Sequence, residues 1–390
     1  MEFVKQVCQL TGLGLTRSLR SRASMTSMIF CIGCAVAILI VMFSMDTGLK
    51  ATTLKNIRSD RAFVVAAGSR ILALSAISRD KLATMEGARG IASGAGPGKL
   101  FAPIVTVMAD VERRRGGGRI AVPVIGVGPA YHAVYPELKL VRGRLFQPGV
   151  HEVIVGRAAT RRVVGAELGA TITLKDVQWL VVGEFEQNGG SAEQAIVTDA
   201  ETLMSAFRIR VFNAAAMLVD TADGGLGALK ADLQANPDLQ VNVKSEQEVL
   251  NDEIRSVSGP LNFVSSVVVT FMLLGAALAA VNAMFSVIDA RGREIATLRA
   301  IGFSDGRILI AVILEMTVLV IPGAVLGAML AFVLCSDSNV ELLGRGIPML
   351  VTAPLMWNGI FVALCVGLLG GIFPALRAVK RSVADALGER

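Results

Sequence analysis

The strongest constraint in this sequence is a set of four long stretches that carry almost no charge. Three of them contain no Asp, Glu, Lys or Arg and one contains only Glu315; the stretches are Ala23–Met45, Ser256–Ile288, Ile308–Ser336 and Gly346–Leu376. Each exceeds the roughly 20 apolar residues that cross the hydrocarbon core of a bilayer. The mean hydropathy of +0.60 agrees with this reading. The sequence therefore predicts an integral membrane protein with four transmembrane helices, over residues 23–45, 261–288, 308–335 and 353–376.

Charged residues are placed unevenly around these spans, which orients the chain. Taken together, the arm 1–22, the segment 289–307 and the tail 377–390 carry more Lys and Arg than Asp and Glu, whereas the loop 336–352 is acidic. Short basic loops stay in the cytoplasm of the cell. We expect both termini and segment 289–307 to be cytoplasmic, and residues 46–260 and the loop 336–352 to lie outside. The basic residues lie in small groups beside the spans, so lipid headgroups rather than nucleic acid are their expected partner.

The N-terminal arm also resembles the start of a signal peptide. It is long, however, the apolar stretch after it is long as well, and MFSMDTGL offers no small-residue cleavage site. We therefore expect an uncleaved membrane anchor.

Residues 46–260 have the composition of a globular domain. After a stalk-like segment at 46–60, strand patterns alternate with helix patterns. Strands are predicted at 61–67, 103–112, 119–127, 152–156, 215–220 and 239–243, a hairpin at 171–185, and helices at 78–87, 199–207 and 225–235. Ser78 and Asp199 are predicted helix caps, and Ser245 with Glu248 forms a capping box. The helix that this box opens should continue through Pro260, with a kink, into the second span. Strands mixed with helices on this plan predict an α+β domain.

No catalytic site is expected on this chain. The only histidines, His132 and His151, have no nucleophile or metal-ligand set nearby in the sequence, and Cys31 and Cys34 form a C-x-x-C inside an apolar stretch, where thiols behave as small hydrophobes. The glycine-rich segment 87–99 lacks the first glycine and the final Ser or Thr of a phosphate-binding loop. We expect no metal or cofactor on this chain and no ATP site.

Segment 289–307 separates the second and third spans and has a pattern of its own. Ile295, Leu298 and Ile301 recur every three residues, while charged residues occupy the rest of the turn: Arg291, Arg293, Glu294 and Arg299. This pattern predicts a short amphipathic helix at the membrane surface. Its apolar side, which Phe303 extends, would either fill a groove on a soluble protein or rest on lipid.

Features inside the spans suggest helix contacts. Small residues four apart permit close helix packing; the pairs are Gly275 with Ala279, Gly323 with Gly327, and Gly367 with Gly371. Pro322 should kink the third span. Glu315, the one ionisable residue of the spans, would cost about 3 kcal/mol at the bilayer midplane. It is expected either to contact a neighbouring span or to extend toward the headgroups or be protonated; the sequence leaves both interpretations open.

Three segments resemble one known family. The segment REIATLRAIGFSDGRI, which includes Gly302 and Phe303, resembles the cytoplasmic coupling helix of the MacB/FtsX/LolC-type ABC transporter permeases. The segment GGIFPALRAVKRSVADAL resembles the closing motif of that family, with Gly370, Gly371, Pro374, Ala375 and Arg377 in place and Val383 where proline is frequent. Residues 139–212 resemble the family's periplasmic core domain.

The resemblance implies a fold and a set of partners. It implies a four-span inner-membrane permease with a large periplasmic domain between spans 1 and 2, working as a homodimer or with a sister permease. A separate ATPase subunit, which binds ATP and Mg²⁺, would grip the coupling helix. A periplasmic adaptor or an outer-membrane component is a further expected partner. The cargo would be a lipoprotein, a peptide or a drug.

Two other functions stay open. One is a regulator similar to FtsX, which transports nothing and activates a cell-wall hydrolase. The other is a membrane-anchored sensor that works without an ATPase.

Overall fold

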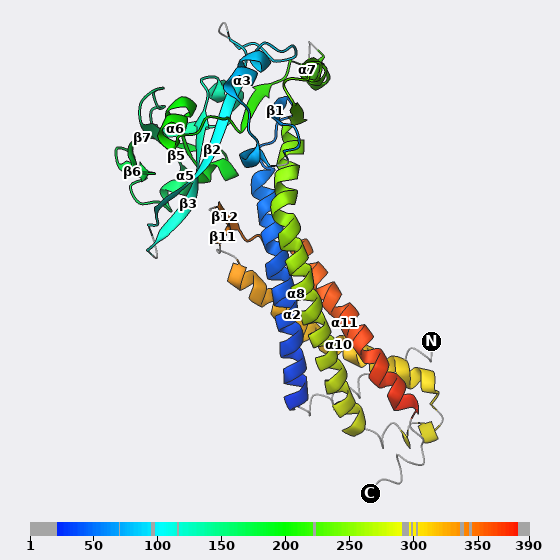
Figure 1. The fold of residues 1–390 in the computed structure, drawn as a ribbon. Coiled ribbons are helices and arrows are strands. Elements are labelled where there is room, and N and C mark those ends of the chain that lie inside the picture. The colour runs from blue at the N-terminus through cyan, green and yellow to red at the C-terminus, as the bar shows by residue number, and fades with distance from the viewer. Residues whose placement is uncertain are drawn as a thin grey trace. The chain divides into compact units, whose positions relative to one another are not determined.

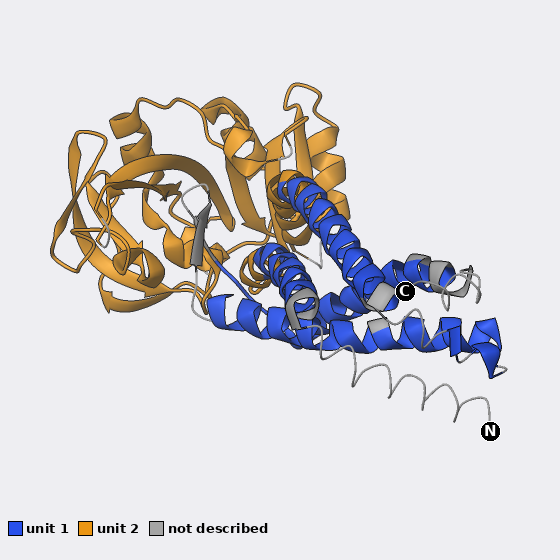
Figure 2. Cartoon of the chain, turned by 90° about the horizontal axis from the view of Figure 1, so that it is seen from below, with its two compact units in different colours: residues 1–47, 261–339, 348–390 blue, residues 48–260, 340–347 orange. Residues whose placement is uncertain are grey.

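The computed structural model describes residues 22–380, except 70, 95–97, 115–116, 221–223, 291–295, 298, 302, 336–338 and 343–344. The chain divides into two compact units, coloured separately in Figure 2. The membrane-helix unit comprises residues 1–47, 261–339 and 348–390, and the α+β unit comprises residues 48–260 and 340–347.

Within the part of the chain that the structure describes, four helices are long and apolar enough to cross a membrane, as predicted. They are α2 (Arg22–Thr53), α8 (Glu246–Ala290), α10 (Asp305–Cys335) and α11 (Ala353–Lys380) (Figure 1). Helix α2 continues past residue 45, the predicted end of the first span. The hydroxyls of Thr47 and Thr52 are satisfied within this extension, because each donates to a carbonyl four residues back, at 3.0 Å. Helix α8 continues through Pro260, as predicted.

The helices of the membrane-helix unit pack through faces spaced four residues apart. Buried residues at this spacing include Ile32, Val36 and Ile40 on α2, Ala276, Ala280 and Met284 on α8, and Val320, Ala324 and Ala328 on α10. A four-residue spacing places side chains on one helix face, so each helix contributes one stripe to a shared apolar core.

Glycines on α10 allow a close backbone contact with α2 in this unit. A Cβ atom on Gly327 would lie 2.3 Å from the carbonyl oxygen of Gly33, and one on Gly323 would lie 2.8 Å from that of Ile29. The predicted small pair on α10 therefore packs against the backbone of α2. A Cβ on Gly367 would similarly meet Val320, whereas one on Gly275 would meet nothing within 4 Å. Two of the three predicted pairs thus include a glycine in close helix contact.

The α+β unit is built on one ten-stranded sheet in the order β10-β1-β9-β2-β3-β8-β5-β7-β4, with β6 paired to β7. The strands are β1 (Arg61–Ala66), β2 (Phe101–Glu112), β3 (Arg119–Val127), β4 (Lys139–Gly143), β5 (Glu152–Gly156), β6 (Thr171–Leu174), β7 (Val177–Glu186), β8 (Ile196–Asp199), β9 (Ala214–Leu218) and β10 (Val241–Ser245). Most pairs are antiparallel, while β3 with β8 and β5 with β7 are parallel. A separate two-stranded sheet joins β11 (Asn339–Leu342) and β12 (Arg345–Pro348), in what the sequence predicted as a loop.

Alternation along the strands gives the sheet two apolar faces. On β1, Ala62 and Val64 belong to one core cluster, whereas Phe63 and Val65 belong to the other. Successive side chains of a strand point to opposite faces, so both faces of β1 are covered. This explains why β1 is continuously apolar after Arg61 rather than alternating with polar residues.

Short helices connect the strands: η1 (Leu72–Leu74), α3 (Arg79–Glu86), α4 (Tyr131–Val134), α5 (Arg157–Thr160), η2 (Ser191–Gln194), α6 (Ala200–Phe207) and α7 (Gly225–Gln234). The predicted cap at Asp199 is confirmed, since its side chain accepts from the Thr202 amide at 2.9 Å. Ser78 occupies the N-cap position of α3, as predicted. Its side chain, however, makes no capping hydrogen bond. The capping box that opens α8 is confirmed, with Ser245 and Glu248 bonded in both directions at 3.0 and 3.2 Å.

Candidate functional site

The predicted coupling segment is described only in part. Residues 296, 297, 299 and 300 are helical, and the Ile301 amide donates to the Thr297 carbonyl at 3.0 Å. Ile301 is 71% exposed, while Phe303 packs against the apolar core of the membrane-helix unit. The predicted contact residues Arg291, Arg293, Glu294, Ile295, Leu298 and Gly302 lie outside the described residues.

One ion pair closes the end of this segment. The Arg299 Nε lies 2.9 Å from a carboxylate oxygen of Asp305, the first residue of α10. The Ser304 carbonyl accepts the Arg307 amide at 3.0 Å. Among the described apolar residues predicted for docking, Ile301 leaves most of its surface exposed. Phe303 instead packs partly against the core of its own chain.

Glu315 is buried inside the membrane-helix unit, with 2% of the residue exposed. A side chain that extended toward lipid headgroups would be accessible, so this burial argues against that interpretation. In the C-terminal motif, Pro374 and Ala375 are buried on α11. A Cβ on Gly370 would stand at ordinary contact distance, 3.6 Å, from the Ala277 carbonyl of α8. The Arg377 side chain lies outside the described atoms.

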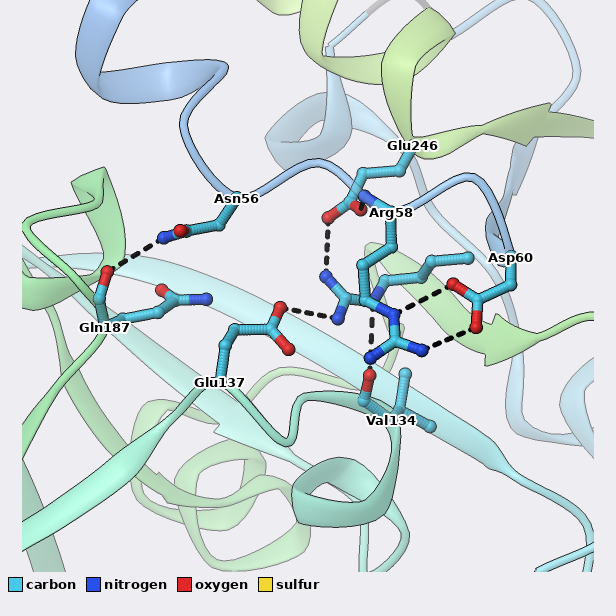
Figure 3. A network of polar contacts seen from close by, with 8 residues as sticks. Asn56, Arg58, Asp60, Val134, Glu137, Gln187 and Glu246 are labelled. Carbon is cyan, nitrogen blue, oxygen red and sulfur yellow. Dashed lines mark hydrogen bonds and ion pairs between the residues drawn. The ribbon is translucent and has the colours of Figure 1, made fainter.

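A second site, which the sequence did not indicate, is a buried charge cluster in the α+β unit (Figure 3). Its centre is Arg61, the first residue of β1, whose side chain is 0% exposed. The Arg61 guanidinium donates to Glu246 at 2.8 Å, to Glu137 at 2.5 Å and to the Val134 carbonyl at 3.1 Å. Its Cζ lies 3.9 Å from the centre of the Tyr135 ring. We call these residues, with Arg58 and Asp60, the Arg61 cluster.

The Arg61 cluster also holds the segment between α2 and β1. Arg58 forms a two-pronged ion pair with Asp60, with hydrogen bonds of 2.8 and 2.6 Å, and the Arg58 amide donates to Glu246 at 2.8 Å. Two residues earlier, the Asn56 side chain donates to the Gln187 carbonyl at 2.8 Å. Glu246 is the first residue of α8, so one carboxylate ties the first turn of α8 both to β1 and to the segment that follows α2.

Electrostatics within the cluster follow from burial and pairing. The hydrogen bonds from Arg58 hold the pKa of the Asp60 carboxyl below its ordinary value. Burial raises the pKa of the Glu246 carboxyl, although Arg61 acts in the opposite direction. Burial likewise raises the pKa values of Tyr131 and Tyr135, which keeps both hydroxyls protonated. Arg61 is therefore a structural cation whose removal would leave buried carboxylates without their partner.

Sequence reasoning missed this cluster for an identifiable reason. The capping box pointed to Ser245 and Glu248, which flank Glu246, but Arg61 and Glu137 are far from Glu246 in the chain and only the sheet brings them together. An arginine at the start of an apolar strand was the sole available signal. Nothing in its spacing identified a partner.

Four apolar helices with an α+β domain inserted between the first and the second define a class of membrane protein. Comparisons with known proteins identify the family. Residues 26–236 match the MacB-like periplasmic core domain, which is more than half of the chain, and residues 266–383 match the FtsX-like permease C-terminal family. The chain belongs to the ABC transporter permeases of the MacB/FtsX type.

Individual relatives are distant. The uncharacterized ABC transporter permease YvrN of Bacillus subtilis (strain 168) is 23% identical over 288 residues, which cover 68% of this chain and 69% of that protein. The uncharacterized permease YknZ of the same strain is 23% identical over 189 residues, 47% of each chain. A crystal structure of the periplasmic region of MacB from Actinobacillus actinomycetemcomitans is 13% identical, with a TM-score of 0.39, and the match covers 50% of this chain and 93% of that one.

Proposed function

We propose that this chain is the permease subunit of an ABC transporter whose separate ATPase subunit drives movement of the α+β domain. The domain lies outside the inner membrane, and both termini lie in the cytoplasm. Its movement pushes or releases an amphipathic cargo, such as a lipoprotein, a peptide or a drug, without passing it between the spans.

The observation that carries this proposal is the continuity of α8. This single helix of 45 residues begins at the Arg61 cluster, in the α+β unit, and ends at Ala290, directly before the coupling segment. Pro260 removes one hydrogen bond inside α8, but the helix continues through it. In this proposal, a displacement applied to segment 289–307 is carried along α8 to Glu246, which bonds to Arg61 on the sheet.

The partners follow from the family and the orientation. The ABC transporter permease family implies an ATPase partner, and ATP with Mg²⁺ would be bound and hydrolysed by that subunit rather than by this chain. The exposed Ile301 and the apolar side of the coupling segment form the proposed ATPase contact, with Arg293, Glu294 and Arg299 at its rim. A second permease chain, identical or related, completes the membrane part, and an adaptor or outer-membrane component joins outside.

The test separates coupling from assembly by softening α8. Four glycines are inserted between Ser258 and Gly259, and the control receives four alanines at the same place. Both insertions add the same length and rotation, but glycine is about 1 kcal/mol per residue less favourable than alanine in a helix. We expect the glycine variant to retain ATPase binding and ATP turnover in lipid discs.

The cellular output, measured as resistance to drugs or peptides, should be lost in the glycine variant and better preserved in the alanine variant. If the glycine variant retains full cellular output, the α+β domain is not driven through α8. A passage between the spans or a sensor would then explain the protein better. Loss of a hydrolase-dependent growth phenotype, with drug and peptide sensitivity unchanged, would instead support the regulator similar to FtsX.

A further inference from the structure

The α+β unit contains a partly enclosed cavity beside the Arg61 cluster, with a volume of about 180 Å³. One wall comes from the sheet and α4, including Phe63, Tyr131 and Tyr135, and another from the first turns of α8, including Glu246, Leu250 and Glu253. All lining residues belong to the α+β unit. The cavity therefore lies where the sheet meets the beginning of α8.

The size of the cavity limits its occupant. An apolar protein cavity of about 150 Å³ is large enough to hold benzene. A volume of about 180 Å³ therefore accepts one ring, or a short branched chain, together with a small head group. Three aromatic side chains in the lining supply the apolar contact for such a group.

The charge of the lining selects the head group. The lining includes the carboxylates of Glu246 and Glu253 and no Lys, Arg or His among the described residues. The adjoining Arg61 cluster holds three acidic residues, Asp60, Glu137 and Glu246, against two arginines. Glu137, which does not line the cavity, has one buried carboxylate oxygen without a hydrogen-bond partner. The lining and the Arg61 cluster together hold four carboxylates and two guanidinium groups, an excess of negative charge that a bound cation would reduce.

The aromatic rings reinforce this selection. The faces of aromatic rings attract cations, and the effect grows when the cation is removed from water. The Tyr131 and Tyr135 ring centres are 4.4 Å apart and the rings are tilted by 31°, so together they form one aromatic wall. Arg61 already lies over the Tyr135 ring, 3.9 Å from its centre, so one face of that ring is occupied within the cluster.

We propose that the cavity binds a small organic cation, a primary ammonium that carries one aromatic ring or a short branched chain. The apolar part packs against the aromatic wall, and the ammonium donates to the carboxylates on the α8 side. The proposal concerns binding and does not depend on the direction or the existence of transport.

The probe is benzylammonium, titrated calorimetrically into the full chain in lipid discs, with protein-free discs as the blank for partition into lipid. We expect one saturable site per chain, with a dissociation constant of about 1 mM or tighter, in keeping with a ligand of so few atoms. Benzyl alcohol, which has the same shape without the charge, should bind at least about tenfold more weakly. Equal affinity for the two compounds, or no saturable binding of benzylammonium, would overturn the proposal.

Paired variants locate the site. Leu250→Trp fills the cavity and should abolish binding, whereas Gln247→Trp places the same side chain on the exposed side of α8 and should leave it unchanged. Glu253→Gln should weaken benzylammonium about tenfold and leave benzyl alcohol unaffected. If Leu250→Trp fails to fold, the selectivity of Glu253→Gln decides the question. Wild-type binding by a folded Leu250→Trp, or an equal loss of both ligands in Glu253→Gln, would contradict the proposed site.

Discussion

Arg61 sets the energetics of its surroundings because it is a buried charge whose guanidinium is surrounded by carboxylates, a carbonyl and a ring. Two carboxylates accept from its guanidinium, and their side chains are 13% and 7% exposed. Taking such charges out of water is costly, and the pairing offsets that cost. The ion pairs and hydrogen bonds of Arg61 therefore stabilise the α+β unit most when all of the partners are present.

Replacing Arg61 should destabilise the α+β unit strongly. Arg61→Met leaves Glu137 and Glu246 buried without their cation, for an expected loss of about 3–5 kcal/mol in the free energy of unfolding. Unfolding in urea can be followed through Trp179, which is fully buried, in a Trp357→Phe background. Arg79→Met, which removes an exposed ion pair with Glu201, is the control and should cost less than about 1 kcal/mol. A similar small loss for both variants would contradict the structural role of Arg61.

Glu246 should give this unit a particular pH dependence. Burial raises the pKa of its carboxyl in the folded state above the unfolded value of 4.5, so the folded protein binds the proton more tightly. The stability that this proton supplies is fully present below the unfolded pKa and is lost as pH rises through the folded pKa. Relative to Glu246→Gln, the wild type should therefore lose stability as pH rises from the unfolded pKa of 4.5 through the higher folded pKa. Urea unfolding of both proteins across this range measures the difference, and a difference that is constant with pH would refute the shift.

Close helix packing in the membrane-helix unit depends on glycines, which have no side chain to hold two helices apart. Gly327 brings the backbones of α10 and α2 together, whereas a Cβ on Gly275 of α8 would have no neighbour within 4 Å. The two glycines occur in similar sequence patterns but have different roles.

Adding one methyl group should distinguish them. Gly327→Ala forces backbones apart and should cost about 1–3 kcal/mol. Gly275→Ala should be neutral or should stabilise α8 by up to about 1 kcal/mol, because alanine favours the helix. Thermal unfolding in a mild detergent compares the variants with the wild type. Equal melting temperatures for the two alanine variants would show that the α2–α10 contact is not tight.

The coupling segment makes its own prediction. Leu298→Asp should abolish co-purification with the ATPase subunit, since burying a carboxylate in an apolar groove costs several kcal/mol. Ala300→Asp adds the same charge at an exposed residue about 200° around the helix and should leave association nearly intact. If the ATPase still binds Leu298→Asp and is stimulated by it, the segment rests on lipid instead.

For the whole molecule, the arrangement of charges predicts which parts face the cytoplasm. In a background without the native cysteines, Leu74→Cys should react with a membrane-impermeant thiol reagent in intact cells whose outer membrane, if present, is permeabilised. Leu74 is 76% exposed in the α+β unit, so access within the fold is not limiting. Ser304→Cys, exposed beside the coupling segment, should react only after lysis. The reverse pattern would invert the proposed topology.

Local patterns in the sequence determined the four apolar helices, most strands of the α+β unit, and the caps at Asp199 and Ser245. The reason is that hydropathy, alternation and capping depend on residues that are close together in the sequence. The family resemblance rested on contiguous motifs for the same reason. Strands β4, β8, β11 and β12 escaped prediction because each is only four or five residues long and the sheets set their pairing partners.

Only the tertiary structure decided which residues meet across long separations. Gly327 and Gly275 carry the same local signal, and packing alone assigned a close contact to one of them. Arg61, Glu137 and Glu246 form a cluster because the sheet aligns β1 beside β10, so that the first turn of α8 reaches a strand far away in the chain. Ion pairs and cavities depend on distances of a few ångströms between side chains. The folded chain sets those distances, and the order of residues in the sequence does not.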